Sequence, residues 1–245
     1  MRSPRAGIDE AGRGPALGPL VVCSLCVPSE DLEFIKATGA MDSKALSSSK
    51  RESVYNDIIR EVENRGWGVG LAVCEPSRID YNSINSDLNS LEVKLFSEAL
   101  ELSADPENSG HLKVDACDVD EDRFGKRVSI ELGEGWKQWD IESRHGMDSL
   151  DIVTSAASII AKVERDSRIG ELSRDLGLDV GSGYPSDPKT RLAVRELVSG
   201  ELPHDCLRWS WKTVAESWYE VHGTPIPSRS GDGKITSQST LGDWG

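Results

Sequence analysis

The first 27 residues contain two short apolar segments joined by a turn rich in glycine and proline, and this pattern constrains the fold most. Residues 5–9 and 20–27 have the length and the Val and Leu content of strands. Residues 12–19 (GRGPALGP) between them favour a turn. We therefore expect the chain to begin with a β-hairpin.

Helical and strand periodicities then alternate along the chain. A capping-box pair, Ser49 and Glu52, precedes apolar residues that recur on one helical face up to Gly66. Residues 67–74 alternate as a strand does. The same patterns predict strands over residues 111–117 and 136–142, and helices over residues 88–99, 152–163, 187–198 and 209–218. This order predicts an α/β fold with a mixed sheet.

The composition bounds the class of protein. A chain of 245 residues with 37% hydrophobic residues is long enough for one packed domain. The longest apolar run, residues 20–27, is far too short to cross a bilayer, and the first residues lack the apolar core of a signal peptide. We expect a cytoplasmic protein without a membrane partner. Five scattered cysteines predict reduced thiols, and Cys23 and Cys26 lack the second ligand pair of a zinc site.

The formal net charge of −14 argues against nucleic-acid binding unless the cations cluster locally. Such a cluster lies near the C-terminal end, where five cations surround two tryptophans. It is our candidate DNA-backbone patch, although at least one tryptophan is expected in the core. The patch consists of Lys189, Arg191, Arg195, Arg208 and Lys212, with Trp209 and Trp211.

Acidic residues occur where core residues are expected. Asp9 and Glu10 end the first strand, and Asp115 lies within the apolar strand 111–117. Asp148 lies just ahead of the helix 152–163. The alternatives are a solvated strand end for the first three and an N-cap for Asp148. Residues 118–122, which are also acidic, are interpreted as a solvated loop.

Carboxylates from separate strand ends and a helix start suit hard divalent cations. Such groups hold two cations about 4 Å apart, which activate a water molecule and stabilise the leaving oxygen in phosphodiester cleavage. The sequence therefore indicates a metal-dependent phosphodiesterase site, with His145 as a nearby histidine to which no role is assigned.

Several blocks of the sequence resemble ribonuclease HII, the type 2 ribonuclease H, in its archaeal form. They occur in family order from residue 6 to about residue 214, and GIDEAGRG together with SAASIIAK is specific to the family. The blocks are GIDEAGRG, GPLVV, DSK, KVDACDV, SAASIIAKVERD, GSGYPSDP and RWSWKTV. The resemblance implies a ribonuclease H-like, mixed five-stranded sheet flanked by helices, with a C-terminal helical extension.

The resemblance also implies an activity. The family hydrolyses the RNA strand of RNA–DNA hybrids and cuts 5′ to ribonucleotides embedded in duplex DNA, leaving 5′-phosphate and 3′-hydroxyl ends. It uses two cations, Mg²⁺ or Mn²⁺, and serves ribonucleotide removal and RNA primer processing during DNA replication and repair. We expect a monomer that acts on both substrates.

The family's functional positions map onto this sequence residue by residue. Its metal-site acids fall on Asp9, Glu10, Asp115 and Asp148. The GRG turn (Gly12, Arg13 and Gly14) matches the family's reader of the 2′-hydroxyl, where small residues permit close approach. Its junction tyrosine matches Tyr184, and the alternative role of this ring is to cover the edge of the core. The remaining substrate-binding positions match Ser43, Lys44 and Lys162, for which the alternatives are an exposed loop and a solvated helix lysine.

The chain after residue 222 changes character. Residues 223–237 are rich in Gly, Pro and Ser and are predicted to be a linker. Residues 238–245 resemble the motif that binds the replication sliding clamp, with Gln238, Leu241 and Trp244 at its spacing but without the usual second aromatic. The predicted divisions are 1–187 for the catalytic domain, 188–222 for the helical extension, 223–237 for the linker and 238–245 for the tail.

Two other functions are compatible with such a fold. A catalytically idle hybrid-binding or clamp-tethered adaptor would have lost a metal-site acid, and all four are present. A general two-metal nuclease or strand-transfer enzyme would not need the GRG turn and Tyr184. We therefore favour the endoribonuclease.

Overall fold

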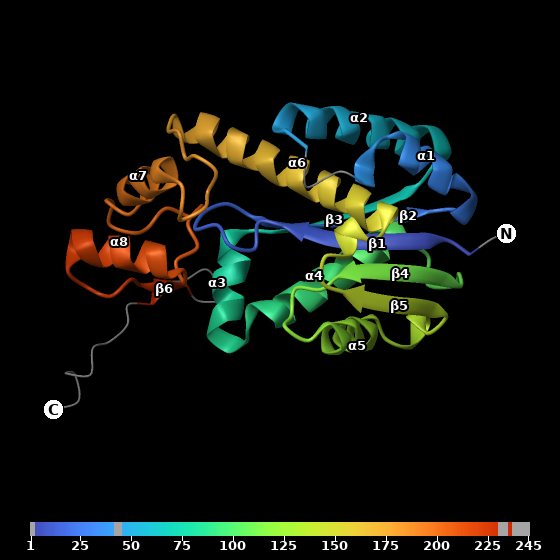
Figure 1. The fold of residues 1–245 in the computed structure, drawn as a ribbon. Coiled ribbons are helices and arrows are strands. Elements are labelled where there is room, and N and C mark those ends of the chain that lie inside the picture. The colour runs from blue at the N-terminus through green and yellow to red at the C-terminus, as the bar shows by residue number, and fades with distance from the viewer. Residues whose placement is uncertain (1–2, 42–45, 230–234, 237–245) are drawn as a thin grey trace. The chain divides into compact units, whose positions relative to one another are not determined.

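The computed structural model describes residues 3–41, 46–229 and 235–236 (Figure 1). The chain divides into two compact units, each assembled from three separate stretches of sequence. The first comprises Met1–Ala11, Val21–Val73 and Asn89–Arg165, and the second comprises Gly12–Leu20, Cys74–Leu88 and Asp166–Gly245. The predicted divisions at residues 187, 222 and 237 stay predictions.

A mixed five-stranded sheet forms the centre of the first unit and confirms the predicted fold class (Figure 1). Its strands are β1 (Arg5–Ala11), β2 (Leu20–Val27), β3 (Gly68–Cys74), β4 (Gly110–Asp115) and β5 (Trp139–Arg144). They lie in the order β3-β2-β1-β4-β5. β1 pairs antiparallel with β2, so the predicted hairpin is confirmed, and it pairs parallel with β4. The acidic pair Asp9 and Glu10 thus lies on the central strand.

Helices cover both faces of this sheet (Figure 1). Alternate residues of β2, such as Cys23 and Leu25, join an apolar core with α1, α2 and the start of α6. Ser24, which points the other way, hydrogen-bonds to Ser103 of α4 over 2.7 Å, and Phe96 of α4 packs edge-on against Phe124 of α5. The helices are α1 (Leu32–Ala37), α2 (Ser48–Arg65), α4 (Leu88–Ser103), α5 (Glu121–Leu132) and α6 (Ile152–Leu176), with short 3₁₀ helices η1 (Ser29–Asp31), η3 (Glu134–Trp136) and η4 (Met147–Ser149).

The second unit has its own apolar core. Ile169 of α6, Val194 of α7 and Trp218 of α8 contribute to it. Trp209 is also buried there, which confirms that one tryptophan of the candidate patch belongs to the core. The elements are α3 (Pro76–Asn85), the end of α6, α7 (Pro188–Leu197), α8 (Lys212–His222) and the strand pair β6 (Ser228–Arg229) and β7 (Ile235–Thr236).

Among the described residues, three α-helices are not predicted by the sequence patterns. α5 begins at Glu121, inside the expected solvated acidic loop, where Asp120 accepts a hydrogen bond from the Arg123 backbone N–H over 2.9 Å and caps the helix. Acidic residues in a first turn also favour a helix electrostatically. Asp118, assigned to the same loop, is 2% exposed and pairs with Arg123. The other two such helices are α1 and α3.

Several predicted boundaries are wrong by a few residues. The N-cap of α2 is Ser47, whose side chain accepts from the Lys50 backbone N–H, and not Ser49. Trp136 belongs to η3 and precedes β5, and α8 begins at Lys212 because Trp209 is held in the core. Among the described residues, no helix is long and apolar enough to span a membrane. All five cysteines are free, as predicted.

Candidate active site

Asp9 is buried on the central strand of the first unit, with 5% of its surface exposed. Two residues earlier, Gly7 lets the start of α6 approach the strand, since a Cβ there would lie 2.3 Å from the Thr154 backbone nitrogen. The close approach brings Ser158 of α6 into hydrogen-bonding contact with the Asp9 carboxylate. Glycine at position 7 therefore lets α6 contribute to the surroundings of Asp9.

Asp115 is the last residue of β4 and is half-buried. Its Oδ1 accepts hydrogen bonds from the backbone N–H groups of Gly146 and Met147, over 2.8 and 3.3 Å. Gly146 adopts the left-handed conformation (φ 67°, ψ 31°), which favours glycine. The turn after β5 thus orients the Asp115 carboxylate, and the alternative of an exposed strand end is wrong for this residue.

Asp148 lies in η4 and is 3% exposed. It does not cap α6, because the Asp151 side chain accepts from the backbone N–H groups of Val153 and Thr154, over 3.0 and 3.1 Å. The N-cap alternative for Asp148 is therefore wrong. Its Oδ1 accepts a hydrogen bond from the Ser149 hydroxyl over 3.3 Å, so the carboxylate is buried for a reason other than beginning the helix.

The three aspartates form one group. Each contributes a carboxylate oxygen, and these oxygens all lie within 4.8 Å of one another. Burial, with the neighbouring charges of Glu10 and Asp115, raises the pKa of Asp9 well above its usual range. A cation would relieve this repulsion, and an all-oxygen donor set of this size suits a hard divalent ion. The residues therefore fit the metal ions expected from the sequence.

Glu10 belongs to a second group. Its carboxylate lies within 4.8 Å of ligand atoms of Glu92 on α4 and of Cys117. Burial and the charge of Glu92 raise the pKa of Glu10 to about 7, while a hydrogen bond joins the Glu10 and Asp9 side chains. Glu92 is fully buried and is not among the residues predicted from the sequence. The only sequence feature that could have indicated it is its position next to Leu91, which belongs to the apolar stripe of the helix.

Lys162 is connected to the aspartate group through Ser158. The Lys162 Nζ donates a hydrogen bond to Ser158 Oγ over 2.7 Å, one helical turn away on α6. Ser158 is fully buried. Lys162 is therefore held beside the carboxylates, and the alternative of a freely solvated lysine is wrong. Ser158 lies in the SAASIIAK block, but the sequence pattern alone assigns it no role.

The GRG turn and Tyr184 lie together in the second unit. A Cβ on Gly14 would lie 3.6 Å from the Tyr184 ring, and the Ala16 backbone N–H donates to the Gly183 carbonyl over 2.8 Å. Tyr184 is 39% exposed, so its ring is not confined to covering the core. Two sequence-predicted substrate positions therefore form one surface.

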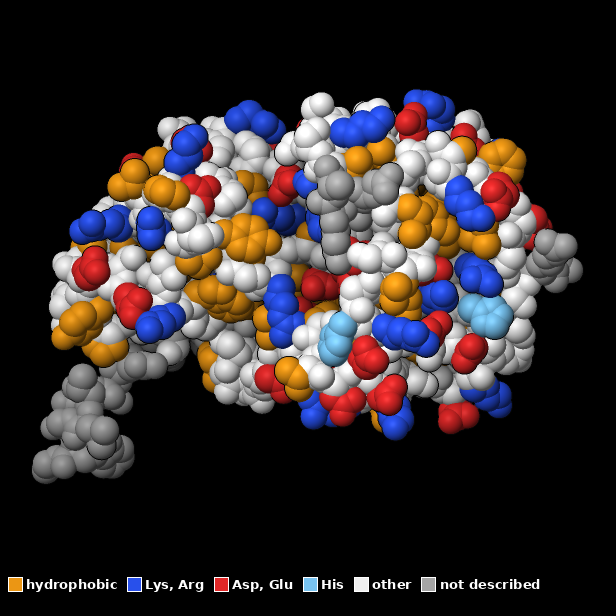
Figure 2. Space-filling model, in the orientation of Figure 1, with side chains coloured by type: hydrophobic (Ala, Val, Ile, Leu, Met, Phe, Trp, Pro, Cys, Tyr) orange, Lys and Arg blue, Asp and Glu red, His pale blue; other side chains and the backbone are white. Residues whose placement is uncertain are grey.

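The candidate DNA-backbone patch needs one correction. Arg208 is fully buried and donates to the backbone carbonyls of residues 12, 13 and 18, so it cannot contact DNA. Lys189 and Arg195 are exposed on α7, but carboxylates of Asp179 and Glu220 lie beside them. Figure 2 shows basic and acidic side chains interspersed on the visible face. The cations of this region do not form a purely basic patch.

His145 is held by the loop after β4. Its Nε2 lies 2.6 Å from the Asp118 carbonyl oxygen, and its backbone N–H donates to Glu121. The remaining predicted positions fall outside the described residues. They are Ser43, Lys44, Gln238, Leu241 and Trp244.

Comparisons with known proteins agree with this chemistry. The family model described as Ribonuclease HII matches residues 6–214. A ribonuclease HII from Methanocella arvoryzae is 45% identical over 214 residues, which cover 84% of this chain and 88% of that protein. The ribonuclease H2 structure from Pyrococcus horikoshii OT3 superposes with a TM-score of 0.77 at 32% identity, and the match covers 89% of this chain and 98% of that one.

A second structure is a PCNA:RNase HII complex from Archaeoglobus fulgidus. It matches with a TM-score of 0.71 at 32% identity over 85% of this chain and 95% of the other. The sequence match, the mixed sheet and the buried carboxylates together lead to one assignment. This chain belongs to the ribonuclease HII family, the ribonucleases H that degrade the RNA of RNA–DNA hybrids.

Proposed function

We propose that this protein cuts duplex DNA 5′ to an embedded ribonucleotide as well as the RNA strand of hybrids, as a monomer, and leaves 5′-phosphate and 3′-hydroxyl ends. Such cleavage serves ribonucleotide removal and RNA primer processing. The observation that carries the proposal is the group of Asp9, Asp115 and Asp148, whose carboxylate oxygens lie within 4.8 Å of one another.

Asp9, Glu10, Asp115 and Asp148 are the proposed ligands of two Mg²⁺ or Mn²⁺ ions. Bound cations of this kind activate water and stabilise the leaving oxygen in phosphodiester cleavage. The chain itself orients the carboxylates: the Gly146 N–H donates to Asp115, and the Ser158 hydroxyl donates to Asp9. These hydrogen bonds leave other carboxylate lone pairs available for a cation.

Recognition of the ribonucleotide is proposed for the GRG turn and Tyr184. The exposed Gly14 allows a sugar to approach the backbone of the turn, and the adjacent Tyr184 ring offers an apolar surface for the next deoxyribose. Lys162, with Ser43 and Lys44, is proposed to bind phosphates near the scissile bond.

The tail is proposed to bind the host's sliding clamp through Gln238, Leu241 and Trp244. The PCNA:RNase HII complex from Archaeoglobus fulgidus supports a partner of this kind. A short helical turn would bring Leu241 and Trp244 onto one face, where they supply nearly all the apolar surface that the tail can bury.

Mapping of the products tests the proposed cleavage. A duplex with one ribonucleotide, labelled on either end of the cut strand, is incubated with the protein and Mg²⁺ or Mn²⁺. We expect one cut on the 5′ side of the ribonucleotide, with a 3′-hydroxyl on one fragment and a 5′-phosphate on the other. A cut on the 3′ side, or a 2′,3′-cyclic phosphate end, would contradict the proposal.

Replacing Tyr184 tests the recognition surface. Tyr184→Ala should lower kcat/KM on the single-ribonucleotide duplex more than on a long RNA–DNA hybrid, where many registers are available. Tyr219→Ala, which removes a 60% exposed tyrosine of α8, is the matched control and should affect neither substrate. Equal losses on both substrates in Tyr184→Ala would assign Tyr184 a structural role.

A further inference from the structure

Arg208 is the largest fully buried side chain of the described residues, and the carbonyls that its guanidinium binds lie within the second unit. It follows Leu207, which pairs with Leu17 in an isolated β-bridge, and the Arg208 backbone N–H donates to the Ala16 carbonyl over 2.9 Å. The backbone thus holds Arg208 beside the loop that begins with the GRG turn. A buried guanidinium needs partners for its N–H groups, and this loop supplies them.

The guanidinium of Arg208 binds three carbonyl oxygens of that loop. Nη2 donates to Gly12 over 2.6 Å, Nη1 to Arg13 over 3.0 Å and Nε to Gly18 over 3.1 Å. The donors of a guanidinium form a planar, rigid fork, so three bonds to one side chain fix the relative positions of the three carbonyls. Arg208 therefore holds the backbone of the turn in one conformation.

The direction of the carbonyls determines the direction of the amides. In a planar trans peptide group, the C=O of one residue and the N–H of the next point in opposite directions. Because the carbonyls of Gly12 and Arg13 point at Arg208, the N–H groups of Arg13 and Gly14 point away from it. Gly14 is exposed and lies next to the Tyr184 ring, so its amide is on the accessible part of the turn.

The positive charge of Arg208 also favours the Arg13 and Gly14 N–H groups as hydrogen-bond donors. A cation at the carbonyl oxygens polarises each peptide group and strengthens its N–H as a donor, as in chains of hydrogen bonds. Gly12, with φ 96°, has a backbone conformation that a residue with a Cβ rarely adopts. The glycines of the turn and the buried guanidinium of Arg208 together direct the N–H groups of Arg13 and Gly14 away from Arg208 as two hydrogen-bond donors.

We propose that Arg208 is a positioning residue for ribonucleotide recognition: it fixes the GRG turn so that the Arg13 and Gly14 amides face a ribose hydroxyl. The inference rests on the proposed role of this turn in substrate recognition. Arg208 does not contact the substrate. Its removal lowers the activity on a duplex with one ribonucleotide more than the activity on a long RNA–DNA hybrid.

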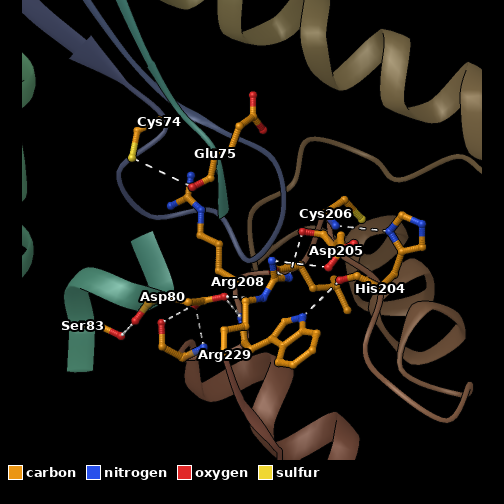
Figure 3. Close-up of polar contacts among 12 residues, drawn as sticks. Cys74, Glu75, Asp80, Ser83, His204, Asp205, Cys206, Arg208 and Arg229 are labelled. Atoms are coloured by element: carbon orange, nitrogen blue, oxygen red, sulfur yellow. Dashed lines mark hydrogen bonds and ion pairs between the residues drawn. The ribbon is translucent and has the colours of Figure 1, made fainter. Parts of the chain in front are cut away.

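Arg229 provides a matched control in the same unit (Figure 3). Its Nη2 donates to the carbonyls of Asp205 and Leu207 over 2.9 and 3.1 Å, and its Nε lies 3.3 Å from Asp80 Oδ2. Its side chain is 10% exposed. Arg229 is therefore another largely covered arginine bound to backbone carbonyls, but its partners are not in the GRG turn.

The test compares Arg208→Lys, Arg208→Gln and Arg229→Lys with the full-length wild-type protein, well below their melting temperatures. kcat and KM are measured on a duplex with one ribonucleotide and on a long RNA–DNA hybrid. We expect both Arg208 variants to lower kcat/KM on the single-ribonucleotide duplex at least tenfold more than on the hybrid. Arg229→Lys should lower the melting temperature and leave the ratio of the two substrates within twofold of wild type.

Backbone mobility of the GRG turn separates this inference from the proposed function. The NMR order parameters of the Arg13 and Gly14 amides should fall from the rigid range of about 0.85 to below about 0.6 in Arg208→Lys and stay unchanged in Arg229→Lys, whichever substrates the wild type cuts. Unchanged order parameters in the folded Arg208 variants, or an equal change of the substrate ratio in Arg229→Lys, would overturn the positioning role. A wild type that does not cut at single ribonucleotides would contradict the proposed function alone.

Discussion

The Lys162 ammonium group donates a hydrogen bond to the Ser158 hydroxyl over 2.7 Å, and Ser158 in turn donates to the buried Asp9 carboxylate. The two bonds connect a candidate phosphate-binding cation with a candidate metal ligand. Because Ser158 accepts a hydrogen bond while it donates one, its bond to Asp9 is strengthened. Ser158 is thus positioned to fix which oxygen of Asp9 faces a metal ion.

Replacing Ser158 should weaken metal binding. Ser158→Ala removes a hydrogen bond to a charged group, which is worth about 1.5 kcal/mol or more, so the divalent-ion concentration for half-maximal activity should rise about tenfold or more. Ser155→Ala is the control, because Ser155 is equally buried on α6 but donates to the Ala40 carbonyl. Metal titrations of activity check the prediction. The same metal requirement in both variants would show that Ser158 only packs the helix.

Gly146 should matter for activity beyond its effect on stability. Gly146→Ala places a Cβ at φ 67° and ψ 31°, which costs roughly 1–2 kcal/mol, and it disturbs the amide that binds Asp115. Gly66→Ala makes the same change at nearly the same angles, φ 67° and ψ 35°, at the end of α2. Urea denaturation should show similar losses of stability. Activity under folded conditions should fall at least tenfold only in Gly146→Ala, and equal activities would contradict the proposed support of Asp115.

The raised pKa of Glu10 makes the stability of the metal-free protein depend on pH. In the folded protein the pKa of Glu10 is about 7, above its ordinary value of 4.5. The folded state therefore binds the proton of Glu10 more tightly than the unfolded chain does. The contribution of Glu10 to stability is therefore present below pH 4.5 and is lost as the pH rises to about 7. Glu10→Gln should flatten this fall in the melting temperature of the metal-free protein, while Glu131→Gln, on the exposed surface of α5, should not. Identical pH profiles for wild type and Glu10→Gln would contradict the assigned protonation.

The tail should be needed for recruitment and not for chemistry. Deletion of residues 237–245 should leave the cleavage of short duplexes unchanged, since every proposed active-site residue precedes them. A tail peptide should bind the host's sliding clamp with a Kd on the order of micromolar or weaker, about 8 kcal/mol, because the second aromatic is missing. Calorimetric titration measures this, with the Leu241→Ala, Trp244→Ala peptide as control. Absence of heat and of competition with another clamp ligand would exclude the motif.

The sequence is most informative where a local pattern decides the structure. Apolar runs and the turn between them predict the opening hairpin and the strand with Asp9, and the family resemblance implies the mixed five-stranded sheet. Asp148 illustrates the limit, because two aspartates, Asp148 and Asp151, precede the same helix and only the structure shows which one caps it. Local pattern cannot distinguish two acids three residues apart.

Burial decided by distant segments cannot be predicted from local sequence. Arg208 is assigned to a DNA-binding surface because it lies among other cations, but its partners are almost 200 residues away, at Gly12, Arg13 and Gly18. Glu92 and Ser158 escape prediction for the same reason: their importance arises from β1, whose Glu10 and Asp9 they approach from neighbouring helices. Side chains that support a site from neighbouring elements carry no local signature.

The most direct test of the central claim is cleavage of a duplex with one embedded ribonucleotide beside the same duplex made only of DNA, with and without Mg²⁺ or Mn²⁺. We predict cutting of the first duplex alone, only with a divalent ion, and a loss of at least a thousandfold in Asp115→Asn. Asp140→Asn, at a largely exposed carboxylate of β5, should keep wild-type activity. Cleavage of the all-DNA duplex, cleavage without a divalent ion, or near-normal activity of Asp115→Asn would contradict the claim.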